Sequence, residues 1–176
     1  MRDLAALVRA WQADFPNAPP VGHLVRQAHA DRWLRIHSLP DSKRYPDTDA
    51  DMGEILRRHT AVATDVLGNE ACALVTGAYA SASDGDWSVP MHEADEAPFW
   101  LNLTVRSVSW RPGAHDALLR SVAHGDAGPV LFYAPALGQA YAPYDGGADL
   151  FFREASTQQA HARRYAAWRS PLPSGL

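Results

Sequence analysis

The chain has 176 residues, of which 47% are hydrophobic and 20% charged, a composition typical of a globular domain that needs no disulfide or metal to fold. Its formal net charge of -4 argues against binding along a nucleic acid backbone, where a basic surface is expected. One cysteine excludes an intrachain disulfide, and no apolar run approaches the ~20 residues that span a bilayer. We expect a single cytoplasmic domain over residues 1–176, with no membrane segment and no nucleic acid partner.

The first 30 residues predict a helical segment that packs on this domain. Apolar residues recur at helical spacing over residues 3–14, and the paired prolines in 17–20 then end the helix. The apolar members are Leu4, Leu7, Val8 and Trp11. A short, partly helical connection over 24–29 leads to the first strand, at 33–39.

A second helix is predicted from Asp49 or Asp51 to Leu67. Aspartate caps a helix N-terminus well, and Gly68 can leave the helix through a left-handed conformation. The apolar residues that follow predict a strand over 71–79.

A long strand begins at Phe99, and its apolar residues change phase along the way. They alternate from Phe99 to Val105 and then shift by one position to Val108 and Trp110. Because a one-residue slip would turn every side chain to the other face, we expect a β-bulge near residues 106–107.

The rest of the chain completes an α+β pattern. Two helices are predicted at 114–124 and 156–168, and three short strands between them at 130–133, 138–141 and 148–152. Neighbouring strands joined by short turns must pair antiparallel. We predict a single domain with a mostly antiparallel sheet of five to six strands and about four helices largely on one side of it. An extra short strand near Trp87 is left open.

The first strand carries unusual chemistry. Its period of two places Arg35 and His37 on one face, about 6–7 Å apart. Arg35 offers a planar fork of donors and His37 a donor that titrates, which favours an anion or carboxylate site. Ser42, Lys43 and Arg44 in the next loop add donors. In the alternative interpretation Arg35 pairs with an acid on a neighbouring strand, and the loop cations are simply solvated.

A second motif lies in the segment 141–149. Asp-Gly-Gly between two apolar runs predicts a hairpin, since glycines tolerate positive φ. As a turn it needs no functional explanation. Asp145 and Asp149 could otherwise bind a cation, act as a carboxylate pair or meet Arg35. We expect an Arg35–Asp149 contact, which would join the two motifs.

Other chemistries find no support in the sequence. There is no HExxH or two-plus-two ligand pattern, no G-x-S-x-G elbow and no phosphate-binding glycine loop, so we expect neither metal nor cofactor. Ser38 and Ser42 have no evident base. His59 lies on the apolar face of a predicted helix and Cys72 in an apolar run, as buried structural residues do.

Four blocks of the sequence together resemble a known family. They are W-L-R-I-H-S-L-P-D-S-K-R-Y-P (33–46), E-I-L-R-R-H (54–59), P-Y-D-G-G-A-D (143–149) and Y-A-A-W-R-S-x-x-x-x-G-L (165–176). They resemble a bacterial family of uncharacterised domains of unknown function, over most of the chain from about Trp33 to Leu176. The resemblance implies a single-domain cytoplasmic protein and brings no activity with it.

Two function classes remain open. The negative charge, the six tryptophans and the lack of a catalytic motif favour a non-enzymatic protein-binding module, for example an immunity protein that neutralises a toxin. The alternative is a small ligand-binding protein or enzyme that acts on a phosphate- or carboxylate-bearing substrate through Arg35, His37 and Asp149. An open cleft at these residues would favour the second class, whereas a helix above them with every donor paired would argue against it.

Overall fold

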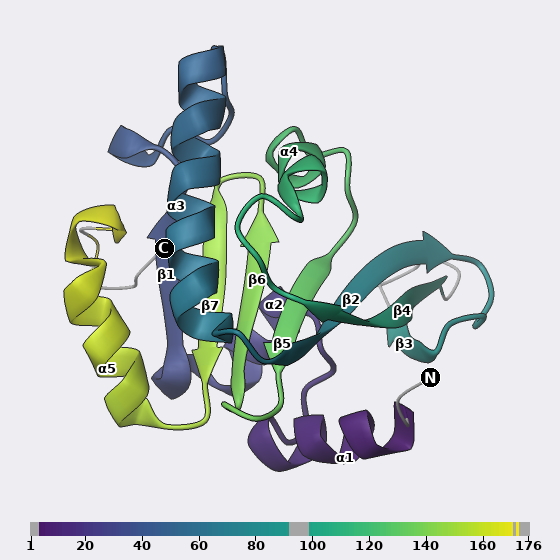
Figure 1. Cartoon of the computed structure of the whole chain (residues 1–176). Helices are drawn as coiled ribbons and strands as arrows, with labels where there is room; N and C mark the ends of the chain where they lie inside the picture. Colours follow the sequence, from purple (N-terminus) through teal and green to yellow (C-terminus); the bar gives the residue numbers. More distant parts are fainter. Residues whose placement is uncertain (1–3, 92–98, 171, 173–176) are drawn as a thin grey trace.

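One antiparallel sheet forms the centre of the protein, as Figure 1 shows for the computed structural model. The structure describes residues 4–91, 99–170 and 172. Within these ranges the sheet has seven strands in the order β1-β7-β6-β5-β2-β4-β3. The strands are β1 (Trp33–His37), β2 (Ala71–Ala80), β3 (Trp87–Met91), β4 (Phe99–Ser109), β5 (Val130–Ala134), β6 (Gln139–Tyr144) and β7 (Gly147–Phe152).

Five α-helices accompany the sheet in the described part of the chain. They are α1 (Leu4–Asp14), α2 (Gly22–Ala28), α3 (Asp49–Leu67), α4 (Asp116–Ala123) and α5 (Ala155–Arg164). Three 3-10 turns are η1 (Ala30–Arg32), η2 (Pro40–Ser42) and η3 (Ala166–Trp168). The α+β class is confirmed, but the predicted five to six strands and about four helices are too few. The short elements β3 and α2 account for the difference.

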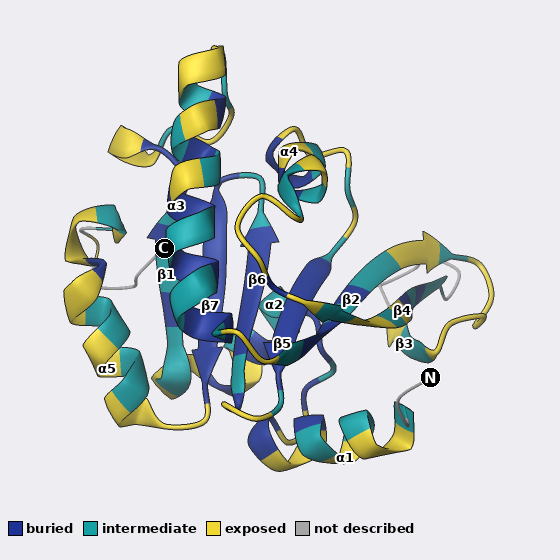
Figure 2. Ribbon diagram, in the orientation of Figure 1, coloured by how far each residue is buried: buried dark blue, intermediate teal, exposed yellow. Residues whose placement is uncertain are grey.

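The helices cover both faces of the sheet, so the prediction that they lie largely on one side is wrong. Side chains of α3 and α4 bury one face around Phe132 and Leu150. Side chains of α1 and α2 bury the other face around Leu131 and Phe151. In Figure 2 the central strands are accordingly buried along their length. A central strand covered on both faces shows a continuous apolar run instead of alternation.

This two-sided burial also explains why the predicted bulge in β4 is wrong. The pairing of β2 with β4 runs without interruption from Ala71 opposite Ser109 to Ala80 opposite Trp100. The first half of β4 is buried on the face covered by α1, where Leu103 lies, and its end on the opposite face, where Trp110 lies. The apolar phase therefore changes because the covering helices change, not because the register slips.

Both outer edges of the sheet are protected. The Gln158 side chain donates a 3.0 Å hydrogen bond to the Trp33 carbonyl on the open side of β1, and Arg58 donates one of 3.0 Å to the His37 carbonyl. At the other edge, β3 contains Pro90, which has no N–H to offer. Such devices disfavour the addition of a foreign strand.

The β6–β7 hairpin is present, but its glycines serve a different purpose from the one predicted. Neither Gly146 nor Gly147 is among the described residues with positive φ. A Cβ on Gly147 would lie 2.1 Å from the Ile36 carbonyl oxygen and 2.8 Å from the Tyr144 hydroxyl. Glycine is thus required here because β1 approaches closely.

Helix α3 begins with a capping box that positions the loop before it. The Thr48 hydroxyl accepts from the Asp51 N–H at 3.1 Å, and the Asp51 carboxylate accepts from the Thr48 N–H at 3.1 Å. Gly68 ends the helix with the predicted positive φ, 61°, but its ψ of -153° lies outside the left-handed helical region. No helix within the described ranges is long and apolar enough to cross a membrane.

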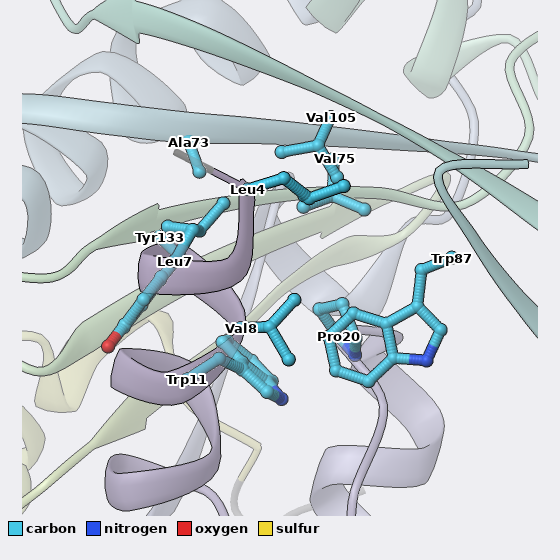
Figure 3. A pocket seen from close by; sticks show the side chains of 10 residues that line it. All are labelled: Leu4, Leu7, Val8, Trp11, Pro20, Ala73, Val75, Trp87, Val105 and Tyr133. Atoms are coloured by element: carbon cyan, nitrogen blue, oxygen red, sulfur yellow. The ribbon is translucent and has the colours of Figure 1, made fainter. Parts of the chain in front are cut away.

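Helix α1 closes the lower face of the sheet (Figure 3), where Leu4 lies beside Val75 and Val105 and Leu7 lies beside Tyr133. The remaining apolar hollow of about 10 Å³ is at the lower limit for a single water and has no polar partner for one. The Asp14 carboxylate anchors the helix end, accepting a 2.6 Å hydrogen bond from the Tyr133 hydroxyl. The hollow between α1 and the sheet is therefore a small gap in the packing and not a ligand site.

Candidate functional site

The predicted contact between Arg35 and Asp149 is present. The two residues are opposite each other on β1 and β7. The Arg35 Nε and Nη2 atoms donate to the two Asp149 carboxylate oxygens at 2.8 and 3.0 Å, and Trp33 Nε1 adds a third bond at 2.9 Å. The antiparallel pairing of the two strands places both side chains on the same face, close enough for a bidentate pair.

Aromatic rings enclose this ion pair. The guanidinium carbon of Arg35 lies 4.8 Å from the Tyr144 ring centroid and 5.3 Å from that of Trp33. Arg26 of α2 covers Trp33 at 5.5 Å, on the face where α2 packs. Burial raises the pKa of the Tyr144 phenol to about 12. Because Arg35 and Asp149 satisfy each other beneath a helix, their arrangement favours a structural role over an open anion site.

The loop cations are also engaged within the chain. Lys43 Nζ lies 2.7 Å from an Asp51 carboxylate oxygen, and hydrogen bonds from Lys43 and the backbone lower the pKa of Asp51 to about 2. Arg44 Nε donates to Asp145 Oδ2 at 3.0 Å, which ties the loop to the hairpin turn. These bonds fix the loop as β1 leaves the sheet. Lys43 and Arg44 are therefore each paired with a carboxylate of the chain, and they do not converge on a common ligand site.

His37 and Ser42, the remaining two predicted site residues, border an open groove of about 440 Å³. Its other side is formed by Trp168 of η3, by Arg169 directly after η3, and by Arg58 of α3. The predicted cluster is thus divided into a closed ion pair, a paired loop and one groove. Described residues from all four blocks that carried the family resemblance lie at this end of β1, namely His37, Arg58, Gly147 and Trp168.

A buried polar chain was missed by the sequence analysis. His59 Nε2 lies 2.7 Å from the Ser38 hydroxyl, and its Nδ1 contacts the Tyr141 hydroxyl. Burial lowers the pKa of His59 to about 4 and raises that of Tyr141 well above its ordinary value. Ser38 thus has a histidine partner, but all three side chains are enclosed in the core. A substrate cannot reach this pair, so its chemistry is structural.

The outer strands β2, β4 and β3 project to the right in Figure 1 and form what we call the acidic arm, described over residues 71–91 and 99–105. In the sequence, the stretch 71–105 contains five acidic residues and no Lys or Arg, a charge of -5 against -4 for the whole chain, and two of the five, Asp84 and Asp86, are among the described residues. Tyr79 near its tip is 57% exposed, and its ring centroid lies 5.8 Å from that of Phe99. Asp84 and Asp86 are exposed in the connection from β2 to β3. The charge segregation could have been found in the sequence, but the exposure of Tyr79 could not.

Metal chemistry has no evident place in the described residues. No group of three or more His, Cys, Asp or Glu side chains within them is arranged to hold a metal ion. Burial raises the pKa of the Cys72 thiol, which disfavours the reactive thiolate.

Comparison with known proteins identifies only a family. A model of the family described as Domain of unknown function (DUF3885) matches residues 21–173, which confirms the resemblance to a family of unknown function. Helix α1 precedes the matched range. No curated protein and no solved structure matches the chain.

Proposed function

The chain belongs to the DUF3885 family, and because that description gives no activity, we propose from its geometry that it is a non-enzymatic module that binds a basic protein. The single observation that carries this proposal is the acidic arm with the exposed Tyr79 near its tip. Aromatic anchors surrounded by polar residues are common in protein interfaces. An acidic surface steers a basic partner toward contact and disfavours acidic ones.

The internal pairing of the polar groups supports binding over catalysis. Arg35 is bonded to Asp149, and the Ser38–His59 pair is sealed in the core. A general base or nucleophile must reach the substrate within hydrogen-bonding distance. An immunity protein that neutralises a basic toxin in the cytoplasm is the specific form of this proposal, since neutralisation requires binding alone.

The test begins with the immobilised protein, which retains partners from a lysate for identification by mass spectrometry. Each purified candidate is then titrated against wild type, Tyr79→Ala and Asp84→Asn by isothermal calorimetry. We expect a basic partner whose affinity falls with added salt and falls about 10-fold or more in Tyr79→Ala, as for an interface anchor. Leu137→Ala is the matched control, because Leu137 is also exposed, at 38%, but lies in the β5–β6 turn.

Two results would contradict the proposal. One is a partner that binds Tyr79→Ala and Asp84→Asn as tightly as wild type. The other is the absence of any basic protein among the retained partners. Leu137→Ala should bind within about 2-fold of wild type, because most surface truncations outside an anchor change affinity little.

A further inference from the structure

The groove beside β1 has polar walls from three separate parts of the chain. His37 ends β1, Ser42 ends η2, Arg58 comes from α3, and Trp168 and Arg169 come from η3 and the residue after it. Its volume of about 440 Å³ lies within the range of small-molecule sites. It is separate from the acidic arm, which lies at the opposite end of the sheet.

The arginines near this groove exceed the carboxylates that neutralise them. The Arg58 side chain is only 8% exposed and donates to Glu54 at 2.6 Å. The same Glu54 also accepts two bonds from Arg57, at 2.7 and 2.8 Å, so one carboxylate serves two guanidinium groups. Arg169 forms no ion pair with any described residue and lies exposed at the rim. Asp41 is the one acidic side chain among the residues that line the groove.

His37 provides a second, independent indication. Its Nε2 atom is buried and has no hydrogen-bond partner among the described residues. Buried polar atoms of this kind are rare in native proteins and commonly bind a water or a ligand. Burial and the nearby charges of Arg35 and Arg58 lower the pKa of His37, so the ring is neutral near pH 7 and can donate one N–H.

The backbone at the groove wall is held in an unusual conformation. Asp41 and Ser42 have φ values of 55° and 57°, in the left-handed region that non-glycine residues rarely enter. Such conformations persist only where the surrounding structure enforces them, and they often occur at ligand sites. The conformation positions Ser42 on the same wall as His37.

We propose that this groove binds the oxyanion of a small organic molecule, a carboxylate or a phosphate, through Arg169, His37 and Ser42. Arg58 contributes positive charge from the floor, where its guanidinium is already oriented by Glu54 and the His37 carbonyl. Charge-assisted hydrogen bonds from a guanidinium to an oxyanion are among the strongest in proteins. The proposal does not depend on the acidic arm binding a partner.

The test compares inorganic phosphate and acetate, each at 10 mM, with chloride at equal ionic strength. A ligand with a dissociation constant of about 1 mM should raise the melting temperature by roughly 3–6 °C. We expect this rise in wild type and in Arg163→Ala, which removes an exposed arginine of α5 outside the groove. Arg169→Ala should lose at least half of the rise, and Ser42→Ala should reduce it.

Nuclear magnetic resonance of the His37 ring separates binding from a general salt effect. The anion that binds should move the His37 ring resonances saturably and raise the pKa of the ring, because a bound negative charge favours its protonated form. A response to phosphate alone, to acetate alone or to both supports the proposal and identifies the group. Equal melting shifts in wild type and Arg169→Ala, or unmoved His37 resonances with both anions, would overturn it.

Discussion

Replacing Asp149 with alanine should be one of the most damaging single changes at this end of the sheet. The carboxylate is 6% exposed and accepts three hydrogen bonds, two from Arg35, whose own side chain is 16% exposed. Removing one partner of a buried ion pair costs about 3–5 kcal/mol, because the other charge stays desolvated. Since Arg35 keeps some access to water, we expect a loss of about 3 kcal/mol in the free energy of unfolding.

Urea denaturation at pH 7, followed by tryptophan fluorescence, measures this loss. A double-mutant cycle with Arg35→Met separates the pair from simple truncation, since the double variant leaves no uncompensated charge. We expect the two single losses to exceed the double loss by about 2 kcal/mol. Lys43→Met is the control, because its ion pair with Asp51 is screened by water and should contribute little to stability. A coupling energy below about 0.5 kcal/mol would refute the conclusion that Asp149 and Arg35 form a desolvated pair.

Two further predictions concern the core and the hairpin. His59 is neutral in the folded protein, with a pKa of about 4 against 6.5 when unfolded, so its contribution to stability is lost as pH falls from 6.5 to 4, by about 3 kcal/mol in all. The free energy of unfolding of His59→Gln, measured by urea titration across this pH range, should depend less on pH than that of wild type. If both proteins show the same dependence on pH, His59 does not have a lowered pKa in the folded state. Gly147→Ala should cost about 3 kcal/mol or more in the same assay, since its Cβ would overlap the Ile36 carbonyl; a loss below about 1 kcal/mol would show that β1 moves away easily.

Part of the site could be predicted from the sequence because it depends on neighbouring strands. The period of two gives the side of β1 that Arg35 occupies, and the hairpin signal gives the return of β7 with Asp149. Asp149 is the one acidic residue within the strands that the sequence predicts, so it was the evident partner for Arg35 once the two strands were taken as neighbours. The two residues are accordingly bonded. The groove was not predictable, because His37, Arg58 and Arg169 come from three distant segments whose meeting is decided by helix docking.

The sequence by itself determined the α+β class, the end of the long helix at Gly68, and the family, whereas the N-cap of that helix is Thr48 instead of the predicted Asp49 or Asp51. These follow from local periodicity, capping and turn chemistry, which act within a few residues. Tertiary structure alone decided which helices cover which face of the sheet, and so why β4 changes phase without a bulge. It also decided that Ser38 and His59 are enclosed while Tyr79 is exposed, because burial depends on neighbours that are remote in sequence.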